Sequence, residues 1–168
     1  MIILDTDIAS AFAKANAFES LAQLLSARHE VCISPKIFEE LQVPLSFGYT
    51  FPNSIFARVE VLNLSAKEQE DYRTLLGQFP HIGKGEVEAI VVCKHRRGWF
   101  SSLDRQALRA AESQGLPTLP FGTILLEFLE QRVYSKDELR VLVEKINRVD
   151  NRQIDFEELG LPNGSGKR

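Results

Sequence analysis

The sequence predicts a single α/β domain built on a mainly parallel sheet. Short β-rich runs alternate with amphipathic helical segments along the chain, which is typical of strands joined by crossover helices. No stretch rich in proline, glycine or serine divides the chain. Its 168 residues are about one domain long, and a domain of this size buries roughly two-thirds of the surface of its unfolded form. It can therefore fold without stabilising disulfide bonds or metal ions.

The first half of the chain begins with a buried strand. Residues 2–4 are a continuous β-rich run, as expected for an interior strand with both faces covered. A helix can begin after it at Asp7 or Ser10. The elements predicted next are a helix over 18–27, a strand over 30–33, a helix over 35–42 and a strand over 58–62. Residues 43–56 contain Pro44, Gly48 and Pro52, and we expect an irregular loop there.

The second half continues the alternation, and capping boxes mark two of its helix starts. In the pairs Ser65 with Glu68 and Ser135 with Glu138, each side chain can satisfy the backbone N–H of the other residue. The predicted elements are helices over 65–77, 86–95, 104–114, 124–130 and 135–148, and strands over 99–103 and 117–119. We expect residues 149–168 to form a C-terminal extension that is disordered from about residue 163.

Composition and charge are those of an ordinary globular protein. Hydrophobic residues make up 44% of the chain and charged residues 26%. The net charge of −3 disfavours a protein whose whole surface is basic and binds nucleic acid non-specifically. No apolar run approaches the ~20 residues of a membrane helix, and no basic flank precedes a signal-type apolar core. We therefore expect a cytoplasmic protein with no membrane segment. Cys32 and Cys93 lie in separate apolar runs and are predicted to be buried thiols.

Acidic residues stand at or near the ends of several predicted strands. They are Asp5, Glu39 with Glu40, Glu86 with Glu88, and Asp104. The carboxyl ends of parallel strands meet at one edge of the sheet, so these carboxylates can converge, and their repulsion then favours binding of a cation. Hard oxygen ligands without sulfur suit Mg²⁺ or Mn²⁺. Neighbouring helix residues point about 100° apart, so only one of Glu39 and Glu40 can reach a shared site.

Each acid also has a purely structural interpretation. Asp5, Asp7 and Asp104 are suited to cap helices, and Glu86 alone would complement a helix dipole. A basic segment likewise has both a functional and a structural interpretation. Five cations stand between residues 94 and 109 against one acid: Lys94, Arg96, Arg97, Arg105 and Arg109. They can contact RNA phosphates or simply form solvated helix ends.

Five sequence blocks, in order, resemble the PIN-domain family. They are ILDTDIAS, ISPKIFEEL, GKGEVEAIVV, SSLDRQALRAAESQGLPTL and FGTILLEFLEQ. The match covers about residues 1–148 and is similar to the VapC-type toxins of toxin–antitoxin pairs. The resemblance implies a three-layer α/β/α PIN-like fold with about five parallel strands.

The resemblance also implies roles for particular residues. Asp5, Glu40, Glu88 and Asp104 match the family's catalytic acids, and Asp5, Glu86, Glu88 and Asp104 match its metal ligands. Thr6, Asp7 and Ser102 match supporting positions. The chain departs from the family where Leu103 replaces a second aspartate before Asp104. The sequence leaves open which of Glu86 and Glu88 is the primary ligand.

The expected function is that of a Mg²⁺- or Mn²⁺-dependent endoribonuclease, the toxin of a toxin–antitoxin pair. The resemblance implies an RNA substrate, a small antitoxin partner and a homodimer. The alternative is an inactive PIN-like module that binds RNA or protein, which the missing aspartate favours. A haloacid-dehalogenase-type phosphatase using Asp5 and Asp7 is disfavoured, because Ala9 stands where that family has threonine or valine.

Overall fold

The computed structural model describes residues 1–161 as a parallel sheet flanked by helices. The strands are β1 (Ile2–Leu4), β2 (Val31–Ile33), β3 (Glu60–Val61) and β4 (Trp99–Ser101), in the order β3-β2-β1-β4. The helices are α1 (Thr6–Lys14), α2 (Phe18–Ser26), α3 (Pro35–Ser46), α4 (Pro52–Phe56), α5 (Ala66–Gln78), α6 (Lys84–Arg96), α7 (Arg105–Ser113), α8 (Phe121–Glu130), α9 (Lys136–Val149) and the 3₁₀ helix η1 (Glu157–Leu159).

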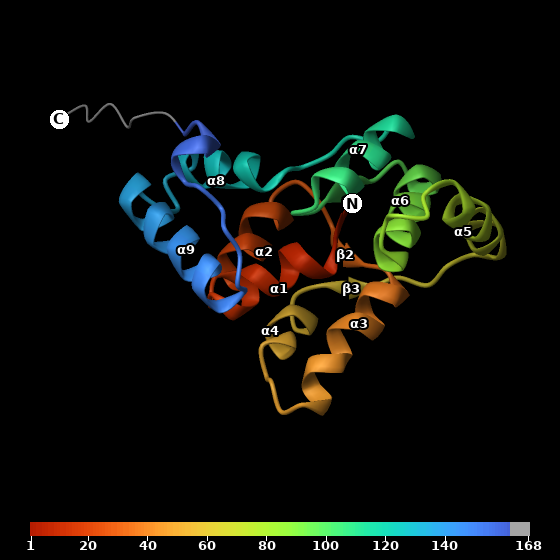
Figure 1. The fold of residues 1–168 in the computed structure, drawn as a ribbon, viewed down its shortest axis with the longest axis horizontal. Helices are drawn as coiled ribbons and strands as arrows, with labels where there is room; N and C mark the ends of the chain where they lie inside the picture. The colour runs from red at the N-terminus through yellow and green to blue at the C-terminus, as the bar shows by residue number, and fades with distance from the viewer. Residues whose placement is uncertain (162–168) are drawn as a thin grey trace.

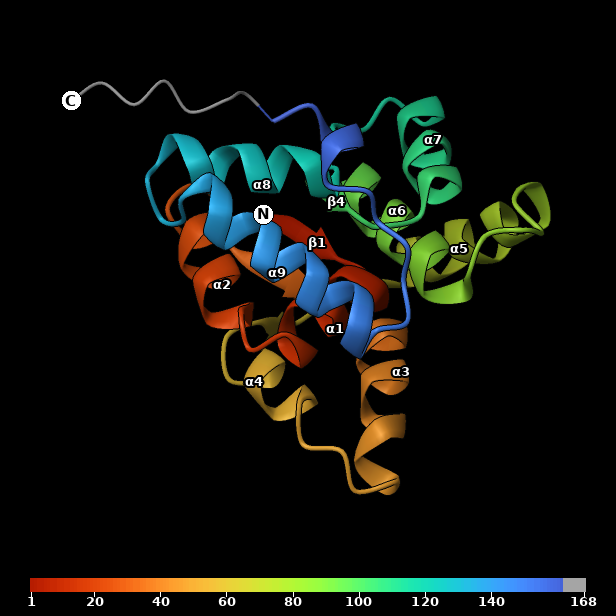
Figure 2. The ribbon, with the colours of Figure 1, turned by 60° about the vertical axis from the view of Figure 1, so that its left-hand side comes forward.

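Helices cover both faces of the sheet, as the sequence predicts. Figures 1 and 2 show α5, α6 and α7 on one side and α1, α2, α8 and α9 on the other. Residues 2–4 of β1 are fully buried between these layers, because β1 lies between β2 and β4 and pairs with both. The three-layer α/β/α fold class is confirmed.

The predicted fifth strand is reduced to a single bridge. Thr118 pairs in parallel with Phe100, and the backbone of Phe100 exchanges hydrogen bonds with Pro117 and Leu119. The described part of the chain therefore has a four-stranded sheet with a one-residue addition beside β4.

The segment expected to be an irregular loop is largely helical. Helix α3 runs on to Ser46 with Pro44 in its last turns, and α4 follows. Ile55 on α4 is fully buried, and the ring centroids of Phe38 and Phe56 are 4.9 Å apart. Burial of these apolar side chains stabilises helical structure that the prolines and glycine alone disfavour.

The segment after α9 packs back onto the domain. Phe156 and Leu161 are buried, Asp150 pairs with Lys14 at 2.6 Å, and Arg152 pairs with Asp7 at 2.8 Å. The predicted disordered tail from about residue 163 lies outside the described residues. Within residues 1–161, no helix combines the length and apolarity that crossing a bilayer requires.

Candidate active site

The first acid of the site is fixed where β1 passes into α1. Asp5 is 2% exposed and caps α1, because its Oδ1 accepts a 2.8 Å hydrogen bond from the Ile8 backbone N–H. Its Oδ2 accepts a hydrogen bond from the Ser102 hydroxyl, which comes from the end of β4. The predicted capping role and the predicted site position of Asp5 are therefore compatible. The serine orients one carboxylate oxygen while the helix start holds the other.

Five carboxylates open onto one pocket of about 210 Å³, which we call the acidic pocket, and four of them come from separate elements. Its lining residues are Asp5, Thr6, Asp7, Glu40, Gly83, Gly85, Glu86 and Asp104. The acids that follow β1 and β4 arrive at the carboxyl edge of the sheet because these strands are parallel neighbours. Helices α3 and α6 add Glu40 and Glu86. The structure thus brings together most of the acids that the sequence singles out.

Two glycines leave room for these carboxylates, a feature that the sequence reasoning missed. A Cβ added at Gly85 would lie 2.9 Å from Oε1 of Glu40, and one at Gly83 would lie 2.9 Å from Oε2 of Glu86. The Gly83 backbone N–H also donates to Glu86 Oε2 at 2.9 Å, and the Thr6 hydroxyl donates to Glu40. The Gly-Lys-Gly segment just before Glu86 is the sequence signal that could have indicated this space for the two carboxylates.

The pocket carries an excess of negative charge, because its five carboxylates outnumber the guanidinium of Arg152, which pairs with Asp7. Burial raises the pKa of the Asp5 carboxyl well above its usual range, and the charges of Asp7 and Glu86 add to this effect against the opposing hydrogen bonds. Burial likewise raises the pKa of Glu86, with further contributions from Asp104 and Asp7. A divalent cation would relieve this repulsion, and carboxylate oxygens are ligands that Mg²⁺ and Mn²⁺ prefer. The donor set therefore fits such an ion.

Glu88 lies apart from the other predicted acids. It is 5% exposed, and its Oε1 accepts a 2.7 Å hydrogen bond from the Lys36 backbone N–H at the start of α3. Glu86 and Glu88 are two positions apart on α6, so they point about 200° apart around the helix. Glu88 instead lines a second pocket of about 390 Å³ with Pro35, Asn63, Leu64, Gln69, Tyr72 and Arg73. On α3, Glu39 pairs with the Lys36 side chain at 2.6 Å, and only Glu40 lines the acidic pocket.

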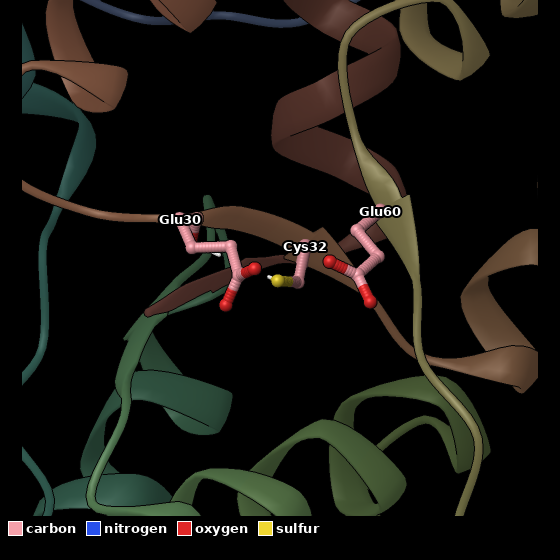
Figure 3. Close-up of side chains that lie close together, drawn as sticks. All are labelled: Glu30, Cys32 and Glu60. Carbon is pink, nitrogen blue, oxygen red and sulfur yellow. Dashed lines mark hydrogen bonds between the residues drawn. The ribbon is translucent and has the colours of Figure 1, made fainter.

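A tighter cluster lies elsewhere on the sheet. Within residues 1–161, one group of three side chains has candidate ligand atoms all within 4.8 Å of one another, and it is Glu30, Cys32 and Glu60. Figure 3 shows the Cys32 sulfur between the two carboxylates, beside β2 and β3. Burial raises the pKa of Cys32 to about 11, so the thiol stays protonated near neutral pH. Neither glutamate is buried, and none of the acids predicted for the active site belongs to this group.

The predicted phosphate-binding cations are spread over two places. Lys94, Arg96 and Arg97 lie at the C-terminal end of α6, whose 13 residues span roughly 20 Å, while the acidic pocket lies at its start. Lys94 donates to Gln114 at 2.8 Å, and Arg96 donates to Glu68 from Nε at 2.7 Å and from Nη2 at 2.9 Å.

The other two cations, Arg105 and Arg109, are exposed on α7, directly after Asp104. Their positions make them the two nearest the acidic pocket in sequence, and they share one face of α7 because they are four residues apart.

Comparison with known proteins agrees with the fold. A family model described as a PIN domain (DUF3368) matches residues 1–155. The structure of VapBC2 from Rickettsia felis bound to a promoter DNA fragment contains a chain similar to this one, with 21% identity, a TM-score of 0.57, and coverage of 72% of this chain and 99% of that one. A chain of VapBC-1 from nontypeable Haemophilus influenzae is also similar, with 16% identity, a TM-score of 0.49, and coverage of 71% and 98%. No curated protein sequence matches significantly. The family model spans most of the chain, and the protein therefore belongs to the PIN-domain family.

Proposed function

We propose that the protein is a metal-dependent endoribonuclease and the toxin of a toxin–antitoxin pair. The observation that carries the proposal is the acidic pocket, where Asp5, Glu40, Glu86 and Asp104 meet at the carboxyl edge of a parallel sheet. Two of these carboxyls have raised pKa values because they are buried close to other acids. Groups that resist ionisation in a cleft are typical of functional sites.

In this proposal Asp5, Glu40, Glu86 and Asp104 would hold Mg²⁺ or Mn²⁺. Glu88 would support the site from outside it, because its Oε1 accepts the Lys36 N–H at the start of α3, the helix that carries Glu40. The ion would supply Lewis acidity, lowering the pKa of the attacking water and offsetting negative charge on the phosphodiester. The chain's own groups set the geometry: the Ser102 hydroxyl orients Asp5 and the Gly83 N–H orients Glu86. Arg105, one residue after Asp104, is the best placed of the predicted cations to contact an RNA phosphate.

We also propose a small antitoxin as the natural partner and a homodimer as the working assembly. Support for the antitoxin comes from the VapBC2 structure from Rickettsia felis, which contains a chain similar to this one. The homodimer rests on the family resemblance. We expect the protein to act in the cytoplasm, where RNA is available and thiols such as Cys32 and Cys93 stay reduced.

A matched pair of neighbouring glutamates tests the nuclease proposal. Glu40→Gln should reduce Mn²⁺-dependent cleavage of single-stranded RNA at least about tenfold, whereas Glu39→Gln should leave it unchanged, because only Glu40 lines the pocket. Asp5→Asn with Asp104→Asn should abolish cleavage, with folding checked by circular dichroism. Undiminished cleavage by that folded double variant would refute the proposal.

The inactive binding module remains the second candidate. Leu103 in place of a second aspartate favours it. Calorimetric titration with Mn²⁺ separates the two candidates, because a nuclease of this kind should bind the ion and lose that binding in the double variant. Absence of binding at millimolar Mn²⁺, together with absence of cleavage, would favour the module.

A further inference from the structure

The second pocket lies on the same edge of the sheet as the acidic pocket. Pro35 follows the end of β2, and Asn63 and Leu64 follow the end of β3, so the second pocket opens at the carboxyl ends of these two strands. The acidic pocket opens beyond β1 and β4. Helix α3 joins the two pockets, because its first residue lines one and Glu40 lines the other. Five residues of helix rise about 7 Å, which is close to the rise of two stacked nucleotides.

The second pocket is lined by a buried carboxylate, one oxygen of which already accepts a hydrogen bond from the protein. Glu88 Oε1 accepts the Lys36 backbone N–H, and we find no hydrogen bond to Oε2 within residues 1–161. The side chain nevertheless lines the pocket. Oε2 is therefore available to accept a hydrogen bond from a ligand. A carboxylate in this position selects for a ligand with N–H or O–H donors.

The walls add an aromatic ring and hydrogen-bond donors. Tyr72 is half-buried and lies close enough to Glu88 that burial, together with that carboxylate, raises the pKa of its phenol. Arg73 is exposed, and among the described residues it forms no ion pair. Asn63 contributes an amide side chain. A ring for stacking, an acceptor and several donors are the groups that recognise an unstacked RNA base.

We propose that the second pocket binds a guanine base of the RNA substrate, close to the cleaved phosphodiester. Guanine offers adjacent N1–H and N2–H₂ donors from which Oε2, the available oxygen of Glu88, can accept, and O6 and N7 acceptors that match an arginine. Adenine and cytosine each pair a single donor group with an acceptor on the same edge, and uracil flanks its donor with two acceptors. The pocket volume of about 390 Å³ lies within the range of small-molecule sites. This inference rests on the proposed ribonuclease activity for its substrate.

Glu88→Gln tests the assignment without removing the structural contact. The amide oxygen of glutamine can still accept the Lys36 N–H, while the group facing the pocket changes from an acceptor to a donor. Arg73→Ala is a second test at an exposed position, and Glu39→Gln is the control, an exposed acid that lines neither pocket. Cleavage of a random single-stranded RNA pool, read by sequencing, should be enriched for guanine at one fixed position for the wild type and for Glu39→Gln. The enrichment should fall at least about fivefold in Glu88→Gln and in Arg73→Ala.

Binding measured without cleavage separates this proposal from the nuclease proposal. In the Asp104→Asn background without metal, the oligomer UUGUU should bind more tightly than UUAUU or UUUUU, and Glu88→Gln should remove that preference. If no variant cleaves RNA but this preference is present and depends on Glu88, the pocket assignment stands and the nuclease proposal fails. Cleavage with a base preference that Glu88→Gln and Arg73→Ala leave unchanged would overturn the pocket assignment alone.

Discussion

The ion pair between Glu68 and Arg96 should stabilise the fold rather than bind RNA. Glu68 starts α5 as part of a capping box, its side chain is 4% exposed, and it accepts two hydrogen bonds from the Arg96 guanidinium on α6. The hydrogen bonds from Arg96 are the main reason that the pKa of Glu68 is lowered from 4.5 to about 2, and the Ser65 backbone contributes less. At about 1.36 kcal/mol per pH unit, this lowering corresponds to roughly 3 kcal/mol of stability.

Part of that value must be discounted, because the Arg96 side chain is 33% exposed and solvent screens the pair. We therefore expect Glu68→Gln to lower the free energy of unfolding by about 2 kcal/mol at pH 7. Glutamine still completes a capping box, so the loss of unfolding free energy measures the contribution of the Glu68 charge. The folded-state pKa is lowered, so the stabilisation is complete above about pH 4.5 and is lost as the pH falls toward 2.

Urea unfolding of the wild type and Glu68→Gln at pH 7, 5 and 3 measures this dependence. Glu70→Gln, an exposed acid on the same helix, is the control and should change stability by less than about 0.5 kcal/mol. Equal stability of Glu68→Gln and the wild type at pH 7, or a deficit that does not shrink at pH 3, would refute the reasoning. Arg96→Gln should likewise lose stability yet keep its RNA affinity. Reduced RNA affinity of the folded Arg96→Gln variant would show that Arg96 binds the substrate.

Three further predictions concern the acidic pocket and the thiols. Asp5→Asn should be more stable than the wild type at pH 7, and this advantage should be smaller near pH 4. The raised pKa of Asp5 means that the wild-type folded state loses stability as the pH rises and the carboxyl ionises. Thermal unfolding of both proteins at both pH values checks this. Gly85→Ala should reduce kcat/KM for RNA about tenfold with an unchanged melting temperature, since its Cβ would displace the carboxylate of Glu40; an unaffected rate would contradict the tight packing there. Cys32 and Cys93, with pKa values raised to about 11 and about 12, should resist iodoacetamide at pH 8 until the protein is unfolded, as mass spectrometry would report.

Local signals in the sequence are sufficient to predict much of the fold. The capping box of Ser65 with Glu68 is confirmed, because its hydrogen bonds join residues three positions apart and need no tertiary partner. The meeting of Asp5 with Asp104 follows from the geometry of parallel strands, which places strand ends at one edge. Both features depend on rules that act over a few residues or over a whole sheet.

Other features depend on how helices are rotated and packed, and sequence patterns do not contain that information. The direction in which Glu86 and Glu88 point is set by the rotation of α6 against the sheet, so the choice between them stayed open. The partner of Arg96 lies 28 positions earlier, and no periodic pattern links the two. Helix α4 forms because Ile55 is buried by distant elements, which outweighs local turn signals.

The pairing of Arg152 with Asp7 makes the rim of the acidic pocket dependent on the last stretch of the described chain. Cutting the protein back to the end of α9 would strip the rim of a compensating positive charge, so polyanions would meet a more repulsive entrance. A protein shortened in this way should therefore bind long polyanionic substrates more weakly, in addition to losing the packing of Phe156 and Leu161 on the domain.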